Sequence, residues 1–118
     1  MDSMQVLNQV METMGFSGSV KPDMQKGFVD FYQAVLKPGS LSVKAKELIA
    51  IALSLSSSCE WCITYHTKLA VDNGATDEEI LEAAYVAVLM SGSPALMHIR
   101  LDRSRKAHGL HDLIKNLH

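Results

Sequence analysis

The most constraining feature of the sequence is an apolar run near its middle. From Leu48 to Leu55 it reads Leu-Ile-Ala-Ile-Ala-Leu-Ser-Leu, and Ser42 is a suitable N-cap for a helix over about 42–57. A helix that is apolar almost all the way round offers no face to water, so we expect it to be buried on all sides. In a chain of 118 residues, such burial is difficult without another subunit. The run therefore predicts a helical core and a homo-oligomer.

The other segments also carry helical patterns, and residues that typically end or begin helices separate them. Gly15 to Gly18 is expected to break the chain, Asn73-Gly74 to end a helix, and Thr76 to open one with a capping box. No run alternates with the period of a strand. The expected helices cover about 4–13, 22–37, 42–57, 59–72, 76–90, a stretch from Pro94, and a short tail at 109–117. The sequence thus predicts one all-α domain over 1–118, a compact bundle of about six to seven helices.

Charge and hydropathy limit the classes of partner. The net charge is −2 and the basic residues are scattered, so no basic face for a nucleic acid is expected. No stretch approaches the roughly 20 consecutive apolar residues that cross a bilayer. The opening residues lack the basic and apolar regions of a signal peptide. We therefore expect a cytoplasmic protein without a membrane or nucleic-acid partner.

The two cysteines of the chain form a Cys-x-x-Cys pair with a histidine close behind. If a helix begins at Cys59, then Cys62 and His66 follow on the same stripe, one and two turns later. The helix N-terminus favours a thiolate, and an imidazole can take up the thiol proton. An adjacent thiol can then resolve a mixed disulfide. The spacing favours two-electron dithiol chemistry.

Two other interpretations of the same residues stay open. The cysteines can be plain core residues, because free cysteine is among the most buried residue types. A zinc site is the other alternative, with Cys59, Cys62 and His66 as ligands and His98 as the fourth. His98 follows the apolar start of the helix from Pro94 and is more typical of a core or interface residue, although it can also line the site. Glu47, beside Lys44, has the pattern of an ordinary surface acid.

A wider pattern resembles a known family. Lys46-Glu47 stands twelve positions before Cys59, and the Cys-x-x-Cys-x-x-x-His motif is followed by an Asn73-Gly74-Ala75 turn and an acidic capped helix. Over about 35–108 this resembles the alkylhydroperoxidase D (AhpD) core of the carboxymuconolactone decarboxylase family. The resemblance implies an all-helical AhpD-like fold, assembly as trimers or hexamers, and a proton relay that activates a thiol. The relay positions correspond to Glu47, Cys59, Cys62 and His66.

The resemblance implies a thiol-dependent antioxidant enzyme of the alkylhydroperoxidase or disulfide reductase type. Its substrate would be a peroxide or a small-molecule disulfide, and an external dithiol would supply the electrons, with no organic cofactor and no metal. Some members carry a histidine between the two cysteines, where this chain has Glu60 and Trp61. The alternatives are a lyase acting on a lactone, with His66 or His98 as general base, and a non-catalytic oligomeric module.

Overall fold

The computed structural model of the chain describes residues 3–100, and every regular element in that part is a helix. The all-α prediction is confirmed. The expected tail helix at 109–117 lies outside the described residues. Between residues 3 and 100, no helix combines the length and the apolar character needed to cross a bilayer. The helices are α1 (Ser3–Val20), α2 (Pro22–Leu36), α3 (Val43–Ser56), α4 (Glu60–Asp72), α5 (Asp77–Ser91) and α6 (Ser93–Arg100).

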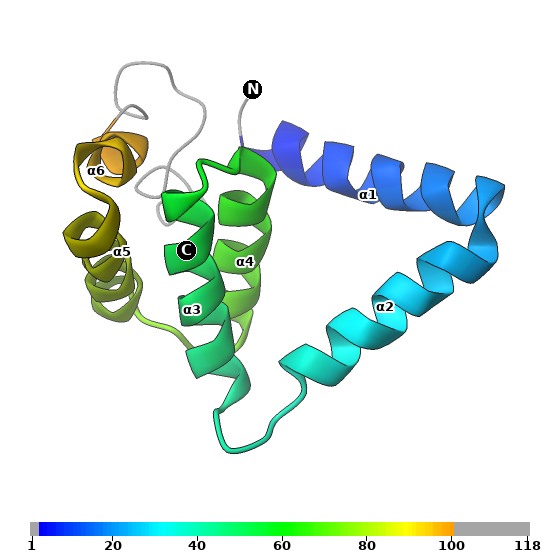
Figure 1. Ribbon diagram of the computed structural model, residues 1–118, viewed down its shortest axis with the longest axis horizontal. Coiled ribbons are helices and arrows are strands. Elements are labelled where there is room, and N and C mark those ends of the chain that lie inside the picture. The colour runs from blue at the N-terminus through cyan, green and yellow to red at the C-terminus, as the bar shows by residue number, and fades with distance from the viewer. Residues whose placement is uncertain (1–2, 101–118) are drawn as a thin grey trace.

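The helices are arranged around a central antiparallel pair, α3 and α4 (Figure 1). On one side, α5 packs against α3, and α6 packs against α5 and α3. On the other side, α1 leaves the start of α4 and α2 returns toward the start of α3, so that α1, α2 and the central pair form a triangle (Figure 1). The dithiol motif lies at the turn between the two central helices.

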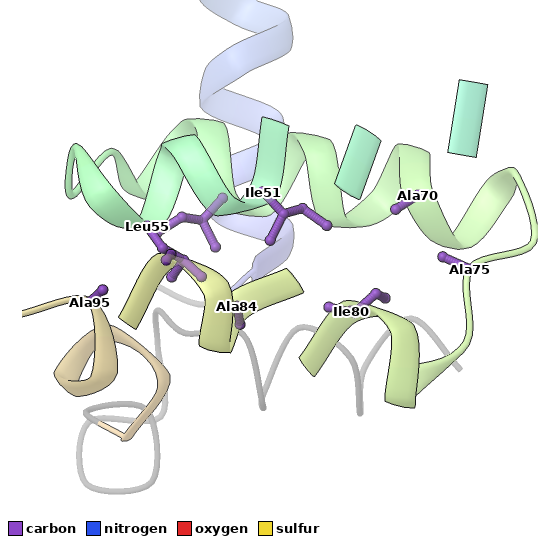
Figure 2. Close-up of a cluster of buried hydrophobic side chains, with 9 residues drawn as sticks. Ile51, Leu55, Ala70, Ala75, Ile80, Ala84 and Ala95 are labelled. Atoms are coloured by element: carbon purple, nitrogen blue, oxygen red, sulfur yellow. The ribbon is translucent and has the colours of Figure 1, made fainter. Parts of the chain in front are cut away.

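The main hydrophobic core lies between α3, α4 and α5 (Figure 2). Ile51 and Leu55 of α3 are fully buried against α5 and α6, where the facing residues include Ala84 and Ala95. Alanines at these positions let the helix axes approach closely while the larger side chains fill the space between them. This core fixes α3, and therefore fixes the residues on the face of α3 that turns toward α4.

The single chain does not bury the third helix on all sides, which agrees with the expectation that such burial needs another subunit. Ile49 and Leu53 are 47% and 65% exposed, because α4 and α5 cover only the side of α3 that carries Ile51 and Leu55. A row on α5 is exposed as well, including Tyr85 and Leu89. Assembly into an oligomer, which would cover these side chains, stays a prediction.

Most of the predicted helix ends are confirmed. The Ser42 hydroxyl accepts the backbone N–H of Ala45 at 3.0 Å, and Thr76 forms a complete capping box with Glu79. Gly74 has a φ of +87°, the left-handed conformation that ends α4 and that glycine adopts without strain. These signals are local, so the sequence places them correctly.

The predicted break at Gly15 to Gly18 is wrong, because α1 runs through both glycines to Val20. A glycine inside a helix costs only about 1 kcal/mol relative to alanine, which does not by itself end a helix. The chain turns at Lys21, whose φ of −134° lies outside the helical range. The following Pro22 disfavours the helical conformation for Lys21 and then supplies the first residue of α2.

Candidate active site

The site begins at the turn between α3 and α4, where the two cysteines are joined by a disulfide. Cys59 is the N-cap of α4, and its sulfur accepts the backbone N–H of Cys62 at 3.3 Å. The preceding Ser58 has a φ of +57°, a left-handed conformation that is uncommon for a residue with a side chain. The predicted position of the cysteines at a helix start is confirmed.

His66 is held by a buried carboxylate. Its Nδ1 lies 2.8 Å from Oε2 of Glu47 on α3, and the two side chains are 14% and 1% exposed. Because a carboxylate accepts hydrogen bonds, Nδ1 carries a proton in this pair and Nε2 is left as the acceptor of a neutral ring. The structure thus brings Glu47 and His66 together, as the family resemblance implies.

Glu47 is therefore not the surface acid that its sequence neighbours indicate. Lys44, its expected partner, pairs instead with Glu79 on α5 at 2.9 Å. This ion pair lowers the pKa of Glu79 to about 2, with a further contribution from its hydrogen bond to the backbone of Thr76. Glu47 points the other way, toward α4, where it meets the imidazole.

Tyr32 on α2 is the site residue that sequence reasoning missed. Its hydroxyl oxygen lies 2.9 Å from Nε2 of His66, and the two rings are stacked with their planes 23° apart. Burial raises the pKa of Tyr32, and the negative charge of Glu47 raises it further, so the side chain stays a protonated phenol. The only signal in the sequence was a hydroxyl on the otherwise apolar face of the second helix.

Lys46 holds the C-terminal end of α2 close to the site. Its ammonium donates to the backbone carbonyls of Val35 and Lys37, each at 2.7 Å. These carbonyls belong to the C-terminal end of α2, where the helix dipole favours a cation. Lys46 and Glu47 are neighbours on α3. Lys46 anchors the end of α2, and Glu47 holds the imidazole that Tyr32 of α2 contacts.

A cavity of about 430 Å³ opens beside these groups, between α1, α2 and α4. Its wall is mostly apolar, and it includes Cys62 and His66 but not Cys59. Trp61 also lines it and donates its Nε1–H to Oε1 of Gln9 at 2.9 Å, which ties α4 to α1. The other lining residues are Val10, Met11, Met14, Phe28, Val29, Tyr32, Gln33 and Tyr65.

His98 does not belong to this site. It lies on α6, which packs against α5 and α3 on the far side of the central pair from α2, and it is absent from the wall of the cavity. Among residues 3–100, no group of three or more histidine, cysteine or acidic side chains is placed to hold a metal ion. The zinc site with His98 as fourth ligand is therefore not formed by the described residues.

Comparison with known proteins places the chain among related sequences. Residues 22–101 match the sequence profile of the carboxymuconolactone decarboxylase family. This match begins earlier than the resemblance at about 35–108, and it includes the helix that carries Tyr32. An uncharacterised protein of Cupriavidus necator is 32% identical over 92 residues, which cover 78% of this chain and 81% of the relative.

Solved structures agree with the sequence match. A carboxymuconolactone decarboxylase family protein from Legionella pneumophila superposes with a TM-score of 0.78 at 36% identity, covering 80% of this chain and 85% of the other. A family protein from Thermotoga maritima, suggested to take part in an antioxidative response, has a TM-score of 0.76 at 31% identity and covers 94% and 88% of the two chains. The fold, the profile and these relatives agree: the chain belongs to the carboxymuconolactone decarboxylase family.

Proposed function

We propose that this protein is a thiol-dependent peroxide reductase that works through the Cys59–Cys62 dithiol. The observation that carries the proposal is the shared position of Cys62 and His66 on one apolar cavity, with His66 held from behind by the buried Glu47. A thiol next to an oriented base is the arrangement that activates a nucleophile. The antioxidative role suggested for the Thermotoga maritima relative supports the same class of reaction.

In the reduced protein, Cys62 is the attacking thiol. It lines the cavity and precedes His66 by one helical turn, whereas Cys59 is held at the N-cap outside the cavity wall. His66 takes the proton from the Cys62 thiol, and Glu47 stabilises the imidazolium that forms. The thiolate then attacks the terminal oxygen of the hydroperoxide, and the O–O bond breaks.

The two electrons for this step come from the sulfur. Cys62 becomes a sulfenic acid, the peroxide becomes an alcohol, and the proton from His66 completes the alcohol. The Cys59 thiol then condenses with the sulfenic acid, which forms the disulfide and releases water. An external dithiol reduces this disulfide by two exchange steps and is itself oxidised, so each cycle consumes one peroxide and one dithiol.

Pre-reduced protein provides the test. With dithiothreitol as the electron donor and cumene hydroperoxide as the substrate, we expect steady peroxide consumption and, without donor, an intact mass lower by two hydrogens. Cys62→Ser should consume no peroxide. Cys59→Ser should form one equivalent of sulfenic acid, trapped by dimedone, because the thiol that resolves it is missing.

The two cysteine variants control for each other, since they make the same change at neighbouring positions. Full peroxide consumption by Cys62→Ser would refute the proposal. Thiols that stay reduced under peroxide while the protein opens a lactone would favour the lyase alternative, in which His66 is the general base and neither cysteine is needed.

A further inference from the structure

Tyr32 contacts the proposed base, His66, and lines the same cavity. We propose that Tyr32 is the general acid that protonates the leaving oxygen of the peroxide, and that His66 restores its proton. This inference rests on the proposed peroxide reductase function and adds a catalytic residue to it. The supporting observations are the contact of the Tyr32 hydroxyl with Nε2 of His66 and the position of the Tyr32 side chain on the cavity wall.

The position of the phenol oxygen leaves room for the thiol proton. The oxygen lies 2.9 Å from Nε2 but also 3.4 Å from Nδ1, so it lies above the face of the imidazole and not in line with the in-plane lone pair of Nε2. The near-parallel rings, 23° apart, agree with this placement. Tyr32 therefore leaves the in-plane lone pair open to the proton of Cys62, and it does not have to move before that transfer.

Protonation of His66 then changes what its Nε2 offers to Tyr32. A neutral imidazole accepts at Nε2, but an imidazolium donates from both nitrogens. With Nδ1–H directed at Glu47, the new Nε2–H donates to the phenol oxygen once the phenol has moved from above the ring toward the ring plane. The phenol O–H is then released toward the cavity, where the peroxide oxygens would lie.

The proton transfers balance with the redox step. The Cys62 thiolate forms the S–O bond as the O–O bond breaks, and the leaving oxygen takes the electron pair of that bond. Tyr32 gives its proton to this oxygen and takes the proton from Nε2 of His66. The net result is one thiol and one hydroperoxide converted to one sulfenic acid and one alcohol, with Tyr32 and His66 returned to their starting states.

The other polar side chains on the cavity wall fit this role less well. Trp61 already donates its N–H to Gln9, and the amide of Gln33 is not an acid under these conditions. Tyr65 is the second phenol, but its ring meets His66 edge-on with the centroids 5.6 Å apart. Burial raises the pKa of Tyr32, which keeps its proton in place until the strongly basic leaving oxygen forms.

The test compares leaving groups of different basicity. An alkyl hydroperoxide such as tert-butyl hydroperoxide leaves as a strongly basic alkoxide that requires a proton, whereas peracetic acid leaves as acetate, which does not. Pre-reduced wild type and Tyr32→Phe are each mixed with both peroxides, and the single-turnover rate of Cys62 oxidation is measured. Iodoacetamide alkylation of Cys62 is measured alongside, because it depends on the thiolate but needs no proton donor.

We expect Tyr32→Phe to lose about a hundredfold in rate with tert-butyl hydroperoxide, the usual size of a general-acid contribution. The rates with peracetic acid and iodoacetamide should change little. Tyr65→Phe removes a phenol from the same wall and should keep the wild-type ratio of the two peroxide rates. The phenylalanine at position 32 keeps the ring that contacts Phe28 and Tyr65, and a thermal melt verifies the fold.

Two results would overturn the inference. An equal loss with both peroxides would mean that Tyr32 only orients His66, and unchanged rates would mean that it has no part in the reaction. Failure of the proposed peroxide reductase function would give a different result. Wild type would then reduce neither peroxide through Cys62, and Cys62→Ser would react at the same rate as wild type.

Discussion

Replacement of the buried carboxylate at Glu47 tests the proposed relay most directly. Glu47→Gln keeps the size of the side chain, and the amide oxygen can still accept Nδ1–H of His66, so the ring keeps its orientation. What is lost is the negative charge that stabilises His66 after it has taken the thiol proton. Both side chains are shielded from water, at 1% and 14% exposure, so little of this interaction is screened by solvent.

The expected size of the effect follows from the contact distance. A hydrogen bond to a charged group at the observed 2.8 Å contributes about 1.5–3 kcal/mol. Since about 1.4 kcal/mol corresponds to a tenfold change in rate, the peroxide reaction of Cys62 should slow by about ten- to a hundredfold. Alkylation by iodoacetamide should slow in parallel, because the variant lowers the fraction of thiolate.

Stopped-flow measurement of peroxide consumption by pre-reduced protein provides the assay. Glu79→Gln is the matched control, since it makes the same substitution at an acid that pairs with Lys44 on another face of the bundle. A folded Glu47→Gln that reacts at the wild-type rate would refute the reasoning and leave Glu47 as a structural partner of His66. Equal slowing in both variants would refute it as well, because the loss would not depend on contact with the imidazole.

Three further predictions concern stability. Ile51→Ala should lower the free energy of unfolding in urea by about 2–5 kcal/mol, because it opens a cavity among fully buried side chains; a loss below 1 kcal/mol would contradict the packing described for α3. Gly74→Ala should cost about 1–2 kcal/mol, since the φ of +87° is unfavourable for alanine, and an unchanged urea midpoint would count against that conformation. The ion pair of Glu79 with Lys44 should stabilise the fold above pH 4.5, and this contribution should be lost as the pH falls toward 2, where the carboxyl gains a proton in the folded state; Glu79→Gln should therefore lower the melting temperature at neutral pH but not near pH 2.

The sequence predicted those parts of the molecule that depend on neighbours within a few residues. The caps at Ser42 and Thr76 are local hydrogen bonds, and the turn at Gly74 depends on one backbone angle. The spacing of Cys62 and His66 follows from the helical repeat alone, so their common face was predictable as well. The break at Gly15 to Gly18 was predicted wrongly because a small local cost was given more weight than the stronger effect of Pro22.

The tertiary structure decided which groups meet at the imidazole. Glu47 is 19 positions from His66, and Tyr32 is 34 positions away on a helix outside the main core. Their contacts depend on the packing of α3 on α4 and on the bonds of Lys46 to the end of α2. Family resemblance pointed to Glu47, whereas the only local sign of Tyr32 was its hydroxyl on an otherwise apolar helix face. Side chains from separate helices converge only when the core fixes the helix axes, and that arrangement is a property of the whole fold and not of any one segment.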